Sequence, residues 1–369
     1  MTECVVLALN AGSSSLKAAL FAGGAELARE TVELNGRDAD GALDELFGRF
    51  QRESLPAPNA VGHRVVHGGP GHTRPVVVDD NVVAALRELA PLAPLHQAPG
   101  LAVLESARAR YRDVPHVACF DTSFHRALPE VAQRFAIDER WWDAGVLRYG
   151  FHGLSYEYLL DAVPTARRGR VVLAHLGSGA SMAALLDGAP RDTTMGLTPT
   201  GGLVMATRSG DLDPGVLLYL ARTQATGRAT ITDVDALEHA VDMTGGLLGL
   251  SGTSADMRLL LTARPRDPRA AMAVAVFCHS ARKHIGALAA VVGGLDLLVF
   301  TGGVGANSPE IRAEICAGLE HLGVTLDPAE NQSGAECISA SDAKCKVLVV
   351  PTDEELVIVR HVETVLSRP

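Results

Sequence analysis

The feature that most constrains the fold of this chain is an internal repeat. Residues 5–20 read VVLALNAGSSSLKAAL, residues 171–186 read VVLAHLGSGASMAALL, and seven of the sixteen aligned positions are identical. In both copies an apolar run enters a Gly/Ser-rich turn and a second apolar run follows, which predicts a β-hairpin. Because the copies lie nearly half the chain apart, we predict a duplicated, two-domain α/β protein with a cleft between its domains. A chance match between two strands of similar composition is the alternative.

Length and composition limit the class of protein. The 369 residues have room for two ordinary domains, and 47% hydrophobic with 21% charged residues allow a large core. The formal net charge of -10 argues against a protein that grips nucleic acid by its phosphates. Aromatic residues make up only 4%, too few for base-stacking platforms. These numbers favour an ordered globular protein and argue against one that binds nucleic acid.

The cysteines and the apolar runs bear on location. None of the six cysteines forms a C-x-x-C pair, so we expect buried or reduced thiols rather than a zinc site or disulfides. The first residues lack a basic segment followed by an unbroken apolar run, as a secretory signal would require. The apolar run 270–278 is too short to span a bilayer. We therefore expect a cytoplasmic protein without membrane contact.

Hydrophobic spacing predicts the other main elements. The expected helices are 79–90, 100–111, 267–292 and 354–366, with Pro91, Pro94 and Pro99 separating the first two. Residues 296–301 (DLLVFT) predict a buried parallel strand. A further helix is expected to begin at Asn307 as its N-cap, with Pro309 in the first turn and Glu310 at the third position.

Three glycine-containing loops each follow a predicted strand. They are residues 10–17 (NAGSSSLK), 175–179 (HLGSG) and 302–307 (GGVGAN). Small residues let backbone amides approach a phosphate closely, and Lys17 adds a positive charge. The Walker spacing is absent, and any one loop could be an ordinary turn. All three together favour a bound nucleotide.

Polar side chains also interrupt four apolar, strand-like segments. These are residues 62–69 (GHRVVHGG), 119–125 (CFDTSFH), 148–153 (RYGFHG) and 205–211 (MATRSGD). Any one of them could hold a core residue satisfied by backbone carbonyls, and we interpret His63, His67 and His125 in this way. The histidines lack the spacing of a transition-metal site. The four segments together predict a convergent anion-binding site.

Taken in order, these segments and several others resemble the acetate kinase family, which belongs to the superfamily of acetate and sugar kinases, actin and chaperone ATPases. The resemblance runs from about Val5 to Arg360. Its other motifs are LAPLH (92–96), TPTGGLVMATRSGDLD (198–213), GLSGTSADMR (249–258) and PTDEEL (351–356). It implies a duplicated ribonuclease-H-like fold with a nucleotide cleft between an N-terminal domain, 1–148, and a C-terminal domain, 149–369. It also implies that the final helix, 354–366, packs on the N-terminal domain.

The resemblance assigns roles to individual positions. Asp121, His152 and Arg208 would be the catalytic residues, with Arg64 binding the acyl carboxylate. The short acyl chain would contact Val66, Leu95, Phe151 and Pro199. Asn10 and Glu354 would hold Mg²⁺, with Mn²⁺ as a substitute, directly or through water. The ATP-binding residues would be Lys17, His175, Leu176, Gly177, Ser178, Gly179, Asp256, Met257, Arg258, Gly303, Val304, Gly305, Ala306 and Asn307.

The implied activity is reversible phosphoryl transfer from ATP to acetate, giving ADP and acetyl phosphate, by a homodimer. A carboxylate is ionised at neutral pH and needs no strong base, so the chemical difficulty is to bring two anions together. Two arginines, a histidine and a magnesium ion supply the positive charge, and Asp121 is better suited to orient Arg208 or metal-bound water than to take a proton.

The sequence departs from the family pattern at several positions. Ser178 replaces the usual asparagine and Ala306 the usual glutamate, Gln97-Ala98 stand where Asn-Pro is common, and Thr200-Gly201 stand where Leu-Glu is usual. None of these would carry charge in the transfer step, so they bear on nucleotide affinity and donor choice. Open alternatives are a propionate-preferring or pyrophosphate-using kinase, an actin- or chaperone-like nucleotide switch, and a non-catalytic paralogue.

Overall fold

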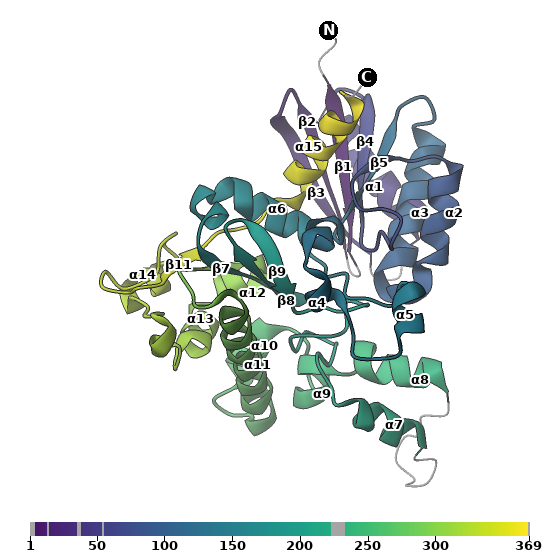
Figure 1. Ribbon diagram of the computed structural model, residues 1–369. Helices are drawn as coiled ribbons and strands as arrows, with labels where there is room; N and C mark the ends of the chain where they lie inside the picture. The colour runs from purple at the N-terminus through teal and green to yellow at the C-terminus, as the bar shows by residue number, and fades with distance from the viewer. Residues whose placement is uncertain (1–3, 13–14, 35–37, 54, 223–232, 368–369) are drawn as a thin grey trace. The chain divides into compact units, whose positions relative to one another are not determined.

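The computed structural model describes residues 4–12, 15–34, 38–53, 55–222 and 233–367. The chain divides into two compact units, which are coloured along the sequence in Figure 1. Unit 1 comprises Met1–Arg126, Ala136–Tyr158 and Asp353–Pro369, and unit 2 comprises Ala127–Phe135 and Leu159–Thr352. Within the described ranges, no helix has the length and apolar character needed to cross a membrane.

Unit 1 is built on a mixed sheet with the strand order β3-β2-β1-β4-β6-β5. Its strands are β1 (Val5–Ala11), β2 (Ser15–Ala22), β3 (Ala25–Glu33), β4 (Ala60–Val65), β5 (Val76–Val77) and β6 (His116–Phe120). Strands β1, β2 and β3 form an antiparallel meander, whereas β1, β4 and β6 run parallel. The carboxyl ends of β1, β4 and β6 therefore share one edge of the sheet.

Both faces of this sheet are covered, because side chains alternate along its central strand. Leu7 and Leu9 of β1 pack with α1 (Ala39–Arg52) and α3 (Pro94–Arg110). Val6 and Ala8 point to the other face and pack with α15 (Glu354–Leu366), the yellow helix of Figure 1. The last helix of the chain thus completes the core of the unit that contains the first strand. The remaining helices of unit 1 are α2 (Asp80–Glu88) and α5 (Glu139–Asp143), and α6 (Gly153–Ala162) continues into unit 2.

Unit 2 has a five-stranded sheet in the order β11-β10-β7-β8-β9. Its strands are β7 (Arg170–Leu176), β8 (Ala180–Leu186), β9 (Ala189–Thr193), β10 (Leu297–Thr301) and β11 (Lys346–Val349). The long helix α11 (Pro268–Val292) packs on β7, β8 and β9. The other helices are α4 (Glu130–Gln133), α7 (Pro214–Arg222), α8 (Val234–Glu238), α9 (Gly246–Ser251), α10 (Met257–Ala263), α12 (Gly302–Asn307), α13 (Pro309–Cys316) and α14 (Pro328–Ser333).

The two sheets confirm the duplication predicted from the repeat. In each unit an antiparallel three-stranded meander is followed by two parallel strands: β3-β2-β1-β4-β6 in unit 1 and β9-β8-β7-β10-β11 in unit 2. The repeated hairpins are β1–β2 and β7–β8. A chance match between strands would not reproduce the whole strand order, so the fold is the duplicated ribonuclease-H-like one.

Most predicted helices are confirmed, with one clear difference in α3. Helices α2, α11 and α15 lie where the hydrophobic spacing predicts them, but α3 begins at Pro94 and includes Pro99, where the sequence predicts a break between two helices. A tertiary contact holds this first stretch. The buried side-chain amide of Gln97 accepts from the backbone N–H of His67 and donates to its carbonyl, both at 3.1 Å. These bonds offset the helix bond that Pro99 cannot donate.

The prediction that Asn307 caps a helix is wrong. Residues 302–307 form a helical turn, α12, so Asn307 ends one helix rather than beginning the next. Its side-chain amide donates to the carbonyl of Gly303 at 2.9 Å. An N-cap needs extended backbone, and Ser308, with φ -120° and ψ 90°, supplies it for α13. The third glycine loop of the sequence is therefore a short helix.

Candidate active site

A cluster of polar side chains lies at the carboxyl-end edge of the unit 1 sheet. Asn10 is near the end of β1, Arg64 is the penultimate residue of β4, and Asp121 follows β6 directly. Because these three strands are parallel neighbours, their last residues meet at one edge, where open α/β sheets bind ligands. Glu354 and Glu355 join the cluster from the first turn of α15.

Arg64 and Asp121 form the centre of this cluster. The guanidinium donates from Nη2 to Asp121 Oδ2 at 2.6 Å and from Nε to both carboxylate oxygens at 3.1–3.2 Å. The Asp121 carboxylate is fully buried, and this burial raises its pKa, although the charge and hydrogen bonds of Arg64 oppose the shift. Burial also disfavours the charged form of Arg64, but the charges of Asp121 and Glu354 outweigh it and raise the arginine pKa. The hydrogen bonds from Arg64 to Asp121 fix the direction of the guanidinium.

The segment before α6 is folded onto Asp121. The backbone N–H of His152 bonds to the Asp121 carboxylate, and the N–H of Gly153 donates to the Asp121 carbonyl at 3.0 Å. A Cβ at position 153 would lie only 2.1 Å from that carbonyl oxygen, so glycine is required there. His152 has φ +60°, a conformation that non-glycine residues rarely adopt. Such strain persists where surrounding contacts hold it, commonly at functional sites.

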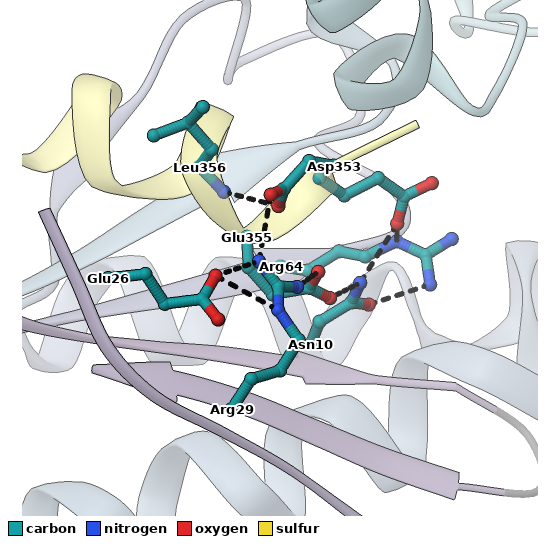
Figure 2. Close-up of polar contacts among 8 residues, drawn as sticks. Asn10, Glu26, Arg29, Arg64, Asp353, Glu355 and Leu356 are labelled. Atoms are coloured by element: carbon teal, nitrogen blue, oxygen red, sulfur yellow. Dashed lines mark hydrogen bonds and ion pairs between the residues drawn. The ribbon is translucent and has the colours of Figure 1, made fainter. Parts of the chain in front are cut away.

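Asn10 connects Arg64 to the acidic start of α15, as Figure 2 shows. Its amide nitrogen donates to Glu354 at 2.9 Å and to Glu355 at 2.7 Å, and its carbonyl oxygen accepts from Arg64 at 3.2 Å. Arg29 of β3 donates to the other oxygen of Glu355 at 2.5 Å. One hydrogen-bond network thus joins β1, β3, β4 and α15.

The donor chemistry of this cluster fits a hard divalent cation. Asp121, Glu354 and Glu355 outnumber Arg64 and Arg29, so the cluster has excess negative charge. Its potential ligands are carboxylate and amide oxygens, which suit Mg²⁺. No group of three or more His, Cys, Asp or Glu side chains in the described ranges is arranged to hold a metal by itself. Magnesium commonly takes one or two protein oxygens and completes its shell with water and phosphate, so a small protein ligand set is what it needs.

The other predicted unit 1 residues lie on β2 and α3 or next to β4 and α6. Val66 follows β4 and is buried, and buried Phe151 packs its ring 5.4 Å from that of His67. Lys17 is exposed on β2, directly opposite Asn10 in the β1–β2 pairing. Leu95 is in the first turn of α3, and its side chain lies outside the described part of the structure, as do Ser13 and Ser14 of the first glycine loop.

Three histidines that the sequence analysis assigned to the core are buried there. His63 Nε2 and His116 Nδ1 are 2.9 Å apart. His67 Nδ1 accepts from the N–H of Gly69, and His125 Nε2 lies 2.9 Å from the carbonyl of Phe151. Burial lowers the pKa of His63 well below its ordinary value and that of His125 to about 4, so both rings are neutral at pH 7.

Unit 2 contains a pocket of about 900 Å³. It is formed by the β7–β8 turn, α10 and its preceding loop, α12 and the start of α13. Eight of the predicted ATP-binding residues line it: Gly177, Ser178, Asp256, Met257, Arg258, Gly303, Val304 and Asn307. The volume is ample for a nucleoside, and the mixture of apolar walls with a few polar groups is typical of cofactor sites.

The remaining predicted ATP-binding residues of unit 2 are not among the lining residues but are their neighbours in β7, the β7–β8 turn and α12. Leu176 is fully buried, Gly305 packs against it, and the carbonyl of Ala306 accepts from the buried Arg312 at 2.8 Å. His175 pairs with Thr301 across β7 and β10, and Gly179 closes the turn by accepting from the N–H of Gly177.

The close packing of the chain after β10 against β7 explains why Gly302, in the third glycine loop, must be a glycine. Gly302 has φ +78°, and a Cβ there would lie 2.6 Å from the Leu176 carbonyl oxygen. Gly303, by contrast, has nothing within 4 Å of the position of a Cβ. The first glycine is required by the backbone, and the second leaves open space at the pocket wall.

Arg208 and Pro199 belong to unit 2 and contact each other. Arg208 is 8% exposed, and its Nη1 donates to the Pro199 carbonyl at 2.8 Å. Asp242 lies near by, accepting from Thr200 at 2.6 Å. Burial raises the pKa of Asp242, although the Thr200 bond and the charge of Arg208 oppose the shift.

The structure therefore brings the predicted residues together in three groups, one in unit 1 and two in unit 2. The unit 1 group contains Asn10, Arg64, Asp121, His152 and Glu354. The unit 2 groups are the pocket and the Arg208–Pro199 pair. Asp121 pairs with Arg64, a contact that the sequence did not predict. The sequence reasoning also missed Arg29 and Glu355 and the pocket residues Ala206, Leu247, Ala255, Leu261, Thr262, Ser308, Pro309 and Glu310. Most of these residues lie in helices, and most belong to no motif that the sequence singles out. Among them, only Glu355 could have been suspected, because it is adjacent to Glu354.

A duplicated ribonuclease-H-like fold with a nucleotide-sized pocket in one unit and an acidic, arginine-bearing cluster in the other defines a kinase of this fold. Solved structures agree. The chain matches acetate kinase from Porphyromonas gingivalis with a TM-score of 0.85 and 32% identity, covering 99% of this chain and 100% of that one. It matches a propionate kinase from Francisella tularensis with a TM-score of 0.88 and 30% identity, covering 98% and 99%.

Sequence relatives identify the family. The Acetokinase family model matches residues 28–360. The acetate kinase of Rhizobium meliloti is 44% identical over 397 residues, covering 99% of both chains, and that of Nitrobacter hamburgensis is 43% identical over 395 residues, covering 98% of this chain and 96% of the relative. The chain belongs to the acetokinase family.

Proposed function

We propose that this chain transfers the γ-phosphoryl group of ATP to acetate, reversibly, giving ADP and acetyl phosphate. Relatives named acetate kinase, at 37–44% identity over nearly the full chain, support this reaction over the alternatives. The observation in the structure that carries it is Arg64, whose guanidinium is fixed by Asp121 beside Asn10 and Glu354. An ATP-driven switch has no second anionic substrate and would not need this arginine.

Arg64 is the residue that would bind the acetate carboxylate. Its side chain is 11% exposed, so it can be reached while the surrounding protein strengthens its electrostatic pull. Val66 and Phe151 lie next to this part of the sheet, and both are buried and apolar. Together with Leu95 and Pro199 they would leave room for a short acyl chain and exclude longer ones.

The pocket of unit 2 would hold the nucleoside of ATP. Apolar side chains such as Met257 and Val304 offer surfaces for the adenine ring, and Asp256 and Asn307 offer polar groups. The turn 177–179, which borders the pocket, would direct backbone amides at the phosphates. Lys17, opposite Asn10, would contact the phosphates from unit 1.

The transfer is a direct in-line displacement. An acetate oxygen forms a bond to the γ-phosphorus as the bond from that phosphorus to the β–γ bridging oxygen breaks, and ADP leaves with the electron pair. The carboxylate is already ionised, so no proton must move. Arg64, Arg208 and His152 would stabilise the charge on the phosphoryl oxygens, and Asp121 would hold Arg64 in place.

Asn10 and Glu354 would hold the divalent cation, which we propose to be Mg²⁺, with Mn²⁺ as a substitute. Bound there, it would neutralise phosphate charge and favour the in-line geometry. The excess of carboxylates over arginines in the cluster supports a cation at this place. Glu354 is 11% exposed, which lets an ion reach it.

Trapping the acyl phosphate tests the reaction. Acetate, propionate and butyrate are each incubated with Mg²⁺ and either ATP or pyrophosphate, and hydroxylamine converts any acyl phosphate into a coloured hydroxamate. We expect the highest yield from acetate with ATP. ATP hydrolysis without hydroxamate from any acid would refute the kinase assignment and favour a switch, and a preference for pyrophosphate or propionate would replace the proposed donor or acceptor.

We also propose a cytoplasmic homodimer. All six cysteines are free thiols, as suits a reducing compartment. Helix α7 buries none of its residues, and the apolar side chains of Val216 and Leu218 are 40% and 55% exposed. A second copy of the chain would cover this face. Light scattering should give twice the chain mass, and Leu218→Asp should shift the protein toward the monomer if α7 is in the interface.

A further inference from the structure

Arg29 lies outside the residues that the proposed reaction uses, yet it contacts the acidic start of α15. It is on β3, the edge strand of the unit 1 sheet, and Figure 2 shows its guanidinium among three carboxylates. Nη1 donates to Glu355 at 2.5 Å, and Nη2 donates to Asp353 at 2.8 Å and to Glu26 at 2.6 Å. The sequence does not predict this contact, because Arg29 lies outside the first glycine loop and the four polar segments.

The contact to Glu355 reaches the proposed cation site through one residue. Glu355 uses Oε2 to accept from Arg29 and Oε1 to accept from Asn10. Asn10 in turn contacts Glu354 and Arg64. Arg29 therefore acts on Asn10 by fixing the carboxylate that Asn10 binds.

The contact to Asp353 fixes the helix that presents Glu354. Asp353 is the N-cap of α15: its Oδ1 accepts from the backbone N–H of Leu356 at 3.0 Å, and its Oδ2 accepts from Arg29. Both oxygens of the cap are thus held, one by the helix and one by the strand. The first turn of α15, which contains Glu354, is tied to β3 through this carboxylate.

The charges explain why an arginine is needed at this place. The Glu355 side chain is 5% exposed and shares the cluster with Glu354 and Asp121. Arg64, the other guanidinium of the cluster, already pairs with Asp121, so loss of Arg29 would leave the Glu355 carboxylate poorly balanced. Glu355 would then turn toward solvent and release the Asn10 amide from the position it has in Figure 2.

We propose that Arg29 is a positioning residue for the divalent-cation site formed by Asn10 and Glu354, an inference that rests on the proposed function. It touches neither proposed ligand. It holds Glu355 and Asp353, and these hold Asn10 and the first turn of α15. Partners of this kind typically change metal affinity by about 10–100-fold when they are removed.

The test compares Arg29→Gln with Arg49→Gln. Arg49 is a matched control, because it is also 34% exposed and also bridges carboxylates, in its case Glu30 of β3 and Glu45 of α1, away from the cluster. Two measurements are made on each full-length variant. One is the Mn²⁺ affinity of the protein with ADP present, followed by the electron paramagnetic resonance of free Mn²⁺. The other is a steady-state hydroxamate assay, which gives both the Mg²⁺ concentration for half-maximal formation and the KM for acetate.

We expect Arg29→Gln to weaken Mn²⁺ binding about tenfold and to raise the Mg²⁺ requirement by a similar factor, with the KM for acetate changed less than twofold. Arg49→Gln should match the unaltered protein in all three. Arg29→Lys keeps the charge near Glu355 but not the three-way contact, so it should recover part of the Mn²⁺ affinity. Equal Mn²⁺ affinities for the Gln variants at positions 29 and 49 would overturn the proposal.

Failure of the positioning role can be distinguished from a folding failure and from failure of the proposed reaction. If Arg29→Gln does not fold, Arg29→Lys decides alone, and unaltered Mn²⁺ affinity in that variant refutes the positioning role. If the unaltered protein makes no acyl phosphate, the proposed function fails, whereas the Mn²⁺ measurement still decides whether Arg29 supports a cation site.

A double substitution tests the route through Glu355. In a Glu355→Gln background, Arg29→Gln should weaken Mn²⁺ binding much less than it does alone, because both changes break the same contact.

Discussion

Replacing Arg64 by alanine should lower both the stability and the turnover of the protein, for different reasons. A second substitution, at Asp121, can separate the two effects. Arg64→Ala leaves the fully buried Asp121 carboxylate without its guanidinium. Breaking a buried ion pair from one side typically costs about 3–5 kcal/mol of unfolding free energy. Loss of one preorganised donor at the reacting centre costs about 2.7–4 kcal/mol of activation free energy, or a factor of 10²–10³ in turnover. We expect both losses in Arg64→Ala.

Replacing Asp121 as well should restore stability without restoring activity. In Arg64→Ala/Asp121→Asn no buried charge is left unpaired at these two positions, so we expect at least half of the lost unfolding free energy to return. Turnover should stay at or below that of the single variant, because the donor is still missing. Both tryptophans, Trp141 and Trp142, lie in unit 1, so urea unfolding followed by their fluorescence reports this unit.

The pH dependence supplies a second check on the same reasoning. Burial already raises the pKa of Asp121 above its ordinary value of 3.8, and loss of Arg64 removes the charge that opposes this shift. A carboxyl group whose pKa is raised in the fold stabilises the fold at low pH and loses that contribution as pH rises. The stability gap between Arg64→Ala and the unaltered protein should therefore widen from pH 5 to pH 8. A constant gap, or no recovery in the double variant, would refute the buried-charge explanation.

Four other perturbations test the remaining site and the core. Arg208→Ala should lower turnover at least about a hundredfold in the hydroxamate assay. Combining it with the Arg64 change should cost less than the two separate losses added together, since we propose that both arginines act on one transition state. The unaltered protein should prefer acetate to propionate by roughly 10–200-fold in kcat/KM, and Val66→Ala should reduce that ratio; an unchanged ratio would exclude Val66 from the acyl pocket. Gly303→Val should fill open space at the pocket wall and weaken ADP binding in calorimetry, whereas Gly286→Val in α11, where a Cβ also meets nothing, should not. Burial lowers the pKa of His63 well below 6.5, so at mildly acidic pH the unfolded chain binds a proton that the folded chain does not. The unfolding free energy of unit 1 should therefore fall by about 1.4 kcal/mol per neutral buried histidine between neutral pH and pH 5.5. His63→Gln should make this fall with pH smaller in urea titrations, and an equal fall would contradict the assignment.

Local sequence patterns were sufficient for the elements whose formation depends on short-range physics. Alternating apolar residues and a small-residue turn predicted the β1–β2 and β7–β8 hairpins, and their similarity predicted the duplication. The capped, amphipathic segments α2, α11 and α15 were predicted for the same reason. Asn10, Arg64 and Asp121 could be singled out because polar residues at the ends of apolar strands are costly to bury without a purpose.

The two errors have different causes, a distant contact in one case and a neighbouring helical turn in the other. Pro99 predicted a break, but the bonds between Gln97 and His67 keep the stretch helical. Asn307 has the chemistry of an N-cap, but the helical turn that follows β10 moved that role to Ser308.

The sequence by itself determined the two repeated hairpins, the family, and which residue types suit an anionic substrate. Only the tertiary structure decided how those residues are paired. Arg64 faces Asp121, separated from it by 57 positions, and Asn10 faces Glu354, separated by 344. Nothing local to Arg29 indicates that it holds Glu355, 326 positions away. Such ion pairs depend on the orientation of long side chains across neighbouring elements, and that orientation exists only once the sheet has formed and α15 has packed against it.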